Sequence, residues 1–181
     1  VGKPLLELLN ADYFASYVWD EEQNKFVSCV QLNMNRENLK VYEDYYQFHD
    51  PITPTLQRRK RATPVSEVMS HDKLVRTEFF NDFLKKDGLC FGLNYFAYDR
   101  GANIGDVRIW RGSQKEDFTD RDAKIVDAIG PSFVNALIRA QNVDELAPTL
   151  RFSQIKDDFQ FTSRQAEIAD LLVLGLRDDE I

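Results

Sequence analysis

The sequence predicts an α+β fold, in which an antiparallel sheet is flanked by helices, followed by the start of an all-α segment. Three observations lead to this prediction. Two pairs of aromatic and β-branched runs are typical of β-hairpins, amphipathic segments lie between and after them, and residues 161–181 begin a separate helical pattern. A chain of 181 residues is long enough to bury one good-sized domain together with an appendage.

Two hairpins are predicted to form the sheet. The first joins residues 13–20 (YFASYVWD) to residues 26–33 (FVSCVQLN) through the polar segment EEQNK. The second joins residues 89–99 to residues 104–111 through the turn RGAN, which contains a glycine.

The last of these strands carries charged residues inside an apolar pattern. Alternation along the strand puts Val107 and Ile109 on the apolar side, and it predicts that Asp106 and Arg108 face water. Trp110 is out of phase with this pattern. We therefore expect one side of the strand to face a cavity or a helix.

Helices are predicted over residues 36–49 and 71–86, between the two hairpins. Both segments repeat aromatic and aliphatic side chains at spacings of three and four. The first should end before Pro51, because proline disfavours helical geometry in the residue that precedes it. The second should stop at Gly88, which can adopt left-handed backbone geometry.

The longest helix is predicted over residues 119–142. Thr119 is a suitable N-cap, and acidic residues occupy the first turn. Pro131 lies inside this segment and predicts a kink. Residues 143–160 lose the periodicity and are expected to form a connector. The domain prediction is therefore 1–142, a connector over 143–160, and a truncated module over 161–181.

Composition excludes several classes of protein. The net charge of −7 and the isoelectric point near 4.9 argue against a nucleic-acid-binding surface over most of this chain. Cys29 and Cys90 each lie in an apolar run, which favours buried, reduced thiols and a cytoplasmic location. The sequence shows no signal peptide and no stretch long enough to span a membrane, and no metal site is expected.

An enzymatic function is not predicted. The two histidines, His49 and His71, and the two cysteines leave few possible nucleophile–base pairs. No nucleophile elbow, phosphate-binding loop, HExxH or dinucleotide-binding glycine motif is present. No cofactor is expected either.

Residues 161–181, FTSRQAEIADLLVLGLRDDEI, have the pattern of a helix, a short turn and the start of a second helix. Thr162 and Gln165 have capping-box spacing, and an apolar helix follows. Gly175 is placed to end that helix, and the acidic residues after it favour a new helix N-terminus. This order is that of a helix-turn-helix, although an ordinary amphipathic helix closing an unrelated domain would share part of the pattern.

This stretch resembles the start of the DNA-binding domain of LuxR-type transcription regulators. Gln165 stands where that family usually has Glu, and Ala169 stands where it usually has Leu. The matching positions are Thr162, Arg164, Glu167, Leu171, Gly175, Glu180 and Ile181. The resemblance covers about the first third of that domain, so about 40 further residues are expected in the natural protein. It implies DNA binding by the complete C-terminal domain, with poor DNA binding by this fragment, and a bacterial homodimer that would read two-fold sites.

Residues 1–142 resemble the GAF/PAS-like sensor domains that are joined to LuxR-type modules, including those that bind acyl-homoserine lactones. The residues that carry this resemblance are Tyr42, Tyr45, Tyr46, Asp50, Pro51, Ile52, Glu78, Phe79, Asn81, Asp82, Phe83, Arg111, Phe118, Thr119, Asp122, Pro131, Ala136 and Leu137. In the lactone receptors, an Asp before a Pro and two aromatic residues line the pocket. Asp50 matches that Asp, but Val41 and Glu37 stand where the aromatic residues would be, which implies a different ligand or a collapsed pocket.

A small apolar or aromatic effector is the ligand that these resemblances suggest. The candidate ligand contacts are Tyr17, Trp19, Tyr45, Asp50, Tyr95 and Trp110. Each aromatic among them could instead be an ordinary core or surface residue, and Asp50 could form a turn. A homoserine-lactone quorum-sensing receptor and a ligand-free dimerisation or scaffold domain remain open as alternative functions.

One concentrated basic run, Arg58-Arg59-Lys60-Arg61, lies between two prolines. It is consistent with contact to a phosphate backbone or an acidic partner, and equally with a solvated loop.

Overall fold

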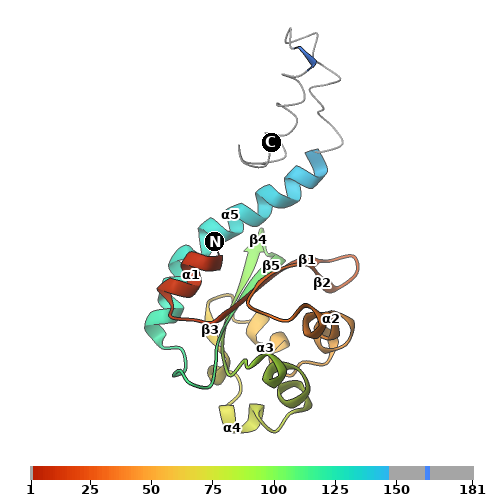
Figure 1. The fold of residues 1–181 in the computed structure, drawn as a ribbon. Coiled ribbons are helices and arrows are strands. Elements are labelled where there is room, and N and C mark those ends of the chain that lie inside the picture. The colour runs from red at the N-terminus through yellow and green to blue at the C-terminus, as the bar shows by residue number, and fades with distance from the viewer. Residues whose placement is uncertain (1, 147–161, 164–181) are drawn as a thin grey trace. The chain divides into compact units, whose positions relative to one another are not determined.

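The computed structural model describes residues 2–146 and 162–163. Its centre is a five-stranded antiparallel sheet in the order β2-β1-β5-β4-β3 (Figure 1). The strands are β1 (Tyr13–Asp20), β2 (Lys25–Leu32), β3 (Thr63–Pro64), β4 (Phe91–Asp99) and β5 (Ala102–Arg111). The predicted fold class is therefore confirmed.

Both predicted hairpins form, and their strands pair with each other in the middle of the sheet. β1 is antiparallel to β5, with Tyr13 opposite Trp110 and Tyr17 opposite Asp106. The turn between β4 and β5 is tight, because Arg100 and Gly101 both have positive φ, 48° and 91°. β3 adds a short edge strand that the sequence analysis did not predict.

Helices and single helical turns fill the connections. They are α1 (Gly2–Leu8), α2 (Arg36–Asp44), η1 (Tyr46–Phe48), α3 (Thr53–Gln57), η2 (Val65–Glu67), α4 (His71–Leu74), η3 (Phe79–Phe83), η4 (Leu84–Asp87) and α5 (Asp120–Leu146).

The helix predicted over residues 36–49 is shorter than expected. Asn35 caps α2 through its side-chain oxygen, which accepts from the N–H groups of Glu37 and Asn38. α2 ends at Asp44, because Tyr45 leaves helical geometry with φ −133° and ψ −61°. A single 3₁₀ turn, η1, completes the segment before Asp50.

The prediction of one continuous helix over residues 71–86 was also wrong. It divides into α4, the π-helical turn η3 and the 3₁₀ turn η4. Thr77 explains the interruption, since its hydroxyl donates to the Leu74 carbonyl at 2.6 Å and accepts from the Phe80 N–H at 3.1 Å. Gly88 ends the segment in left-handed geometry, with φ +79°, as predicted.

The longest helix, α5, runs from Asp120 to Leu146 and so extends into the predicted connector. Its start is a reciprocal cap in which Asp122 accepts from the Thr119 N–H, and the Thr119 hydroxyl accepts from the Asp122 N–H. Pro131 lies inside the helix.

The sheet is covered on both faces (Figure 1). α1 packs on one face, where Gly2 lies against Phe14 and Leu32, and the first part of α5 covers the same face through Gly130 and Phe133, which contact Tyr95. The other face carries α2, α3, η3 and the main aromatic core. The candidate site lies in this second layer.

The chain divides into two compact units, Val1–Val134 and Asn135–Ile181. In the second unit, the described residues are 135–146 and 162–163, and of the proposed capping box Thr162 is non-helical and Ser163 is helical. Arg164, Gln165, Glu167 and Gly175 lie outside the described residues. The boundaries at 142 and 160 therefore stay predictions.

Candidate functional site

A small cavity lies between the sheet and the helical segments of the aromatic layer. Its volume is about 20 Å³, which is room for about one water molecule. The lining is largely apolar and aromatic, with a few polar groups. It consists of Ala15, Tyr17, Met34, Leu39, Tyr42, Asp50, Ile52, Thr53, Phe79, Phe83, Leu89, Asn94, Arg108 and Trp110.

β5 supplies charged groups to this interior, which corrects the sequence analysis. Asp106 and Arg108 were expected to face water, but their exposed fractions are 0% and 6%. They share one face of the strand with Trp110, and that face is the inner one. Gly92, opposite Trp110 on β4, makes room for the indole, since a Cβ there would lie 2.8 Å from the ring.

Arg108 is held by one carboxylate and three aromatic rings. Its Nε donates to Asp106 Oδ2 at 2.7 Å, and its Nη2 is 2.7 Å from the same oxygen. The guanidinium carbon lies 4.8 Å from the centre of the Tyr17 ring and 4.6 Å from those of Phe26 and Tyr42. These distances are typical of cation–π contacts, so the aromatic groups stabilise a buried cation.

Burial and charge set the protonation of this cluster. Burial alone would lower the pKa of Arg108, but Asp106 and the neighbouring tyrosines hold it well above its usual value. Burial raises the pKa of Asp106 above 3.8, while Arg108 and the Tyr17 N–H oppose that shift. Burial also raises the pKa values of Tyr17 and Tyr42 well above 10.0, so both phenols remain neutral.

Asp50 lines the same cavity, but its oxygens already have partners. Oδ1 accepts from the N–H groups of Ile52 and Thr53 at 2.9 and 2.6 Å, which forms a side-chain turn just before α3. Oδ2 accepts from the Tyr42 hydroxyl at 3.3 Å. Asp50 therefore acts as a turn former, as one of the two sequence interpretations held, and also fixes a tyrosine of the lining.

Two buried polar atoms of the lining, the Tyr17 hydroxyl and Asn94 Oδ1, have no hydrogen bond to a nitrogen or oxygen atom among the described residues. Arg108 Nη2 has no hydrogen bond of good geometry either, but it lies 2.7 Å from Asp106 Oδ2 in the ion pair. The Cys29 thiol, a weak partner, lies close enough to Tyr17 to influence its pKa. The exposed fractions of Tyr17 and Asn94 are 1% and 2%. Because an unpaired buried polar group is costly, this grouping marks a place for a polar guest.

The six candidate ligand contacts are divided by the fold. Tyr17, Asp50 and Trp110 line the cavity, and their role as ligand contacts stays a prediction. The other three do not line it, and their role as ligand contacts likewise stays a prediction. Trp19 is half-buried against Phe26, Tyr45 is 42% exposed and stacks on His49, and Tyr95 points to the opposite face toward Gly130 and Phe133.

The positions that hold pocket aromatics in lactone receptors point away from this interior. Val41 is 41% exposed and Glu37 is also exposed. Tyr42, the neighbour of Val41, provides the buried aromatic ring of α2 instead.

Most of the basic run has local partners. Arg61 forms an ion pair with Glu67 at 2.6 Å, Lys60 lies over the Tyr98 ring at 5.0 Å, and Arg58 donates to Thr55 at 3.3 Å. These contacts agree with the interpretation as a loop on the surface of the domain.

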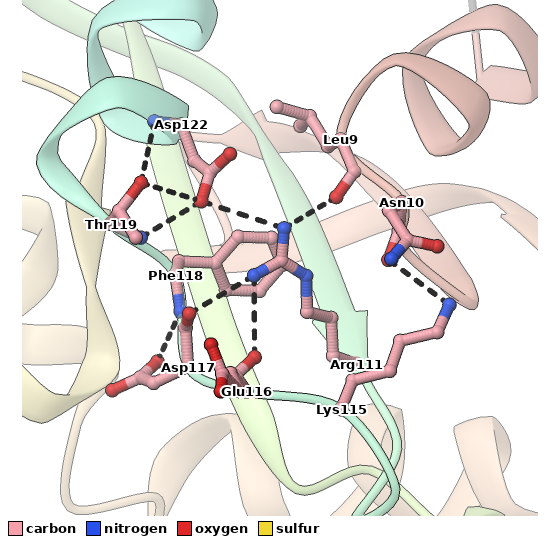
Figure 2. Close-up of polar contacts among 9 residues, drawn as sticks. All are labelled: Leu9, Asn10, Arg111, Lys115, Glu116, Asp117, Phe118, Thr119 and Asp122. Carbon is pink, nitrogen blue, oxygen red and sulfur yellow. Dashed lines mark hydrogen bonds and ion pairs between the residues drawn. The ribbon is translucent and has the colours of Figure 1, made fainter.

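Arg111, on the opposite face of β5, joins three elements (Figure 2). Its guanidinium donates to the carbonyl oxygens of Leu9, Glu116 and Asp117 at 2.5, 3.2 and 3.0 Å. It also lies 3.5 Å from the Asp122 carboxylate and stacks over Phe118 at 4.1 Å. The end of α1, the end of β5 and the start of α5 are thus held at one side chain, which directly follows Trp110 of the cavity.

A cysteine and a histidine also come together. Cys90 Sγ lies 3.8 Å from His71 Nε2 beside the Phe91 ring. Burial and the nearby Asp117 raise the pKa of the Cys90 thiol, which makes it a poor nucleophile.

Neither a metal site nor a membrane span is found in the described part of the chain. No cluster of three or more His, Cys, Asp or Glu side chains there is arranged to hold a metal ion. Likewise, none of the helices described combines the length and apolar character that crossing a bilayer requires.

Comparisons with solved structures place the fold among GAF domains and related ligand-binding domains. A GAF domain/HD domain protein from Geobacter sulfurreducens is 18% identical, with a TM-score of 0.58 over 77% of this chain and 88% of that one. CepR2 from Burkholderia cenocepacia, an N-acylhomoserine lactone-dependent LuxR family transcription factor, is 16% identical, with a TM-score of 0.53 over 75% and 78% of the two chains.

The LBD domain of VqsR from Pseudomonas aeruginosa is 16% identical, with a TM-score of 0.52 over 74% of this chain and 79% of that one. No family model matches the sequence, and no curated protein matches it significantly. At these identities the likeness shows a GAF-like fold.

Proposed function

We propose that this chain is the sensor part of a bacterial DNA-binding transcription regulator of the LuxR type. The observation that carries the proposal is the interior cavity, lined by Tyr17, Asn94 and the buried Arg108, in a fold shared with LuxR-type ligand-binding domains. The LuxR-like pattern of residues 161–181 supports an output on DNA.

The route from input to output runs along β5. Arg108 and Trp110 contact the cavity, and Arg111 holds the first turn of α5 from the other face. A ligand that moves β5 would therefore change the position of the start of α5. In a homodimer, which two-fold DNA sites favour, such a change would alter the spacing of paired DNA-binding modules.

α5 is the candidate helix for dimer contacts, although part of its apolar face already packs against the sheet. Ala123, Val126 and Phe133 are buried, whereas Ile125 and Ile129 are only half-buried and remain available for a partner.

Selection of genomic fragments by the full-length natural protein tests the proposal. We expect enrichment of a two-fold symmetric sequence, and a variant with Glu167→Ala and Gly175→Pro should lose it. Failure of the full-length protein to enrich any sequence would contradict the proposed function.

A second function is favoured by one observation. The cavity holds about one water, so the interior is nearly filled, as expected of a ligand-free dimerisation or scaffold domain. A homoserine-lactone ligand receives less support, because Val41 and Glu37 lie outside the cavity lining.

We also propose that the chain is not an enzyme and that it uses no cofactor. The Cys90–His71 pair is long, at 3.8 Å, and its thiol has a raised pKa. The titratable groups of the cavity are engaged with one another through Asp106–Arg108 and Tyr42–Asp50 contacts.

A further inference from the structure

The outer edge of β2 is closed by a side chain in its first half and open in its second half. β2 is the last strand of the sheet, so β1 pairs with only one of its edges. In the closed half, the Phe26 N–H donates to the Gln47 side-chain oxygen at 2.8 Å, which takes the place of a strand partner. A bulge at Ser28, with φ +55°, separates the halves. Beyond it, no group of the described residues outside β1 bonds the backbone of residues 29–31.

A groove of about 450 Å³ lies beside the open half of this edge, and α2 forms its other wall (Figure 1). Three residues link β2 to α2, so the helix starts beside the end of the strand and returns along it. At the far end, the Glu43 carboxylate influences the pKa of the Cys29 thiol. An edge strand with a helix beside it is the geometry in which sheets bind an extended peptide. The groove is lined by Cys29, Val30, Gln31, Arg36, Leu39 and Glu43.

The groove carries one cation and one anion that have no ion-pair partner in the described part of the chain. Arg36 is exposed at one end, and the ion pairs of the domain are formed by other side chains. Glu43 is at the other end, where burial and then Asp44 raise the pKa of its carboxyl, while Lys40 opposes the shift. Between them lie the buried Leu39 and the half-buried Cys29. A peptide with the opposite order of charges would complement this groove.

We propose that β2 binds an antiparallel strand of a partner protein, whose side chains toward the groove read acidic–x–apolar–x–basic from its N-terminus. A strand antiparallel to β2 runs in the direction of α2, so its acidic residue meets Arg36 first and its basic residue meets Glu43 last. The apolar residue packs on Leu39 and Cys29. Arg36 and Glu43 are about 10 Å apart along the helix axis, and residues i and i+4 of a strand are about 13 Å apart, a difference that long side chains close.

The occupant comes from another protein and not from a second copy of this chain. An acidic residue followed at two by an apolar one and at four by Lys or Arg occurs here only in 72–76 and 82–86. Both lie in helical segments, so neither is free to form a strand. β2 itself, KFVSCVQL, has no acidic residue to offer to Arg36 of a copy. The net charge of −7 also opposes pairing between copies.

Peptide titration into the isotope-labelled chain tests the proposal. The probe is a blocked peptide with the central segment Glu-Thr-Val-Thr-Lys, and NMR follows the amides of residues 29–31. We expect saturable shifts of these amides. The charge-reversed peptide Lys-Thr-Val-Thr-Glu, which matches the groove only as a parallel strand, should bind about tenfold more weakly.

Methylated peptides distinguish strand pairing from attraction between charges. One is N-methylated at the first, third and fifth residues of the segment, and the other at the second and fourth. Because alternate N–H groups of a strand point to opposite edges, one peptide should lose binding and the other should keep it. Equal retention by both would overturn the proposal.

A matched pair of variants locates the peptide. Arg36→Glu should weaken binding of Glu-Thr-Val-Thr-Lys about tenfold, and Lys-Thr-Val-Thr-Lys should bind this variant better than the original peptide does. Lys124→Glu makes the same charge change at an exposed position of α5, over the opposite face of the sheet, and should leave binding unchanged. The proposal fails if no peptide shifts the amides of residues 29–31, or if the two variants behave alike.

Discussion

The guanidinium of Arg108 lies 2.7 Å from the carboxylate of Asp106, and both side chains are buried within the face of the sheet that lines the cavity. Two residues of one strand therefore place a neutral ion pair inside an aromatic layer. The pair is costly to desolvate and more costly to break, because a single remaining charge would have no buried partner.

Arg108→Met should destabilise the domain by about 3–5 kcal/mol, since it leaves Asp106 buried without its cation. The double variant Asp106→Asn/Arg108→Met should recover most of that loss, because the amide oxygen can still accept from the Tyr17 N–H. Urea unfolding measures both. A single variant within about 1 kcal/mol of the wild type would show that the pair is dispensable.

Tyr42→Phe and Tyr17→Phe should change stability in opposite directions. The Tyr42 hydroxyl donates to Asp50, so its removal should cost about 1 kcal/mol. The Tyr17 hydroxyl has only the weak Cys29 thiol as a partner, so its removal should be neutral or stabilise by up to about 1 kcal/mol. Equal losses in thermal or urea unfolding would contradict this reading of the cavity.

Arg111→Lys should loosen the junction between β5 and α5. A lysine keeps the charge but cannot reach the carbonyl oxygens of Leu9, Glu116 and Asp117 together, so we expect a loss of about 2–3 kcal/mol. Hydrogen exchange should become faster in residues 112–122 while the β1–β2 hairpin is unchanged. Arg121→Lys, at an exposed position of α5, is the matched control. Uniform exchange across the domain would mean that Arg111 has no local role.

Alkaline pH should unfold the domain through its buried tyrosines. The folded pKa values of Tyr17 and Tyr42 are raised above the ordinary value of 10.0. Above that pH the unfolded chain loses protons that the folded chain keeps, so stability is complete below pH 10 and falls as pH rises, by about 1.4 kcal/mol per pH unit for each tyrosine. Phenolate absorbance and circular dichroism should then change together for these two residues. Ionisation of these two tyrosines without loss of the circular dichroism signal would contradict the prediction.

Much of the sheet could be predicted from the sequence because its strands are dense in aromatic and β-branched residues. Which face of β5 is buried could not be predicted in this way, because hydropathy alone places Asp106 and Arg108 in water. Trp110 could have indicated the buried face, since it lies on the same face as both charged residues and a tryptophan favours burial. A buried charge pair is visible only when its partners and aromatic neighbours are known.

The breaks in the helical segments also could not be predicted from the spacing of apolar residues. Tyr45 and Thr77 interrupt their helices through local backbone geometry and a side-chain hydrogen bond, and neither changes the apolar spacing. Residue type alone makes Trp19, Tyr45 and Tyr95 candidates for a pocket lining. The position of each ring, however, is decided by the strand face or helix side on which its residue lies.

Native mass spectrometry of the protein purified from its own host tests the central claim, that the GAF-like domain binds an effector in its interior. We expect a bound small molecule on the wild type and on Tyr95→Phe, with reduced occupancy on Tyr17→Phe. Protein that is consistently free of any small molecule, with all three forms alike, would contradict the claim and favour a scaffold domain with a filled core.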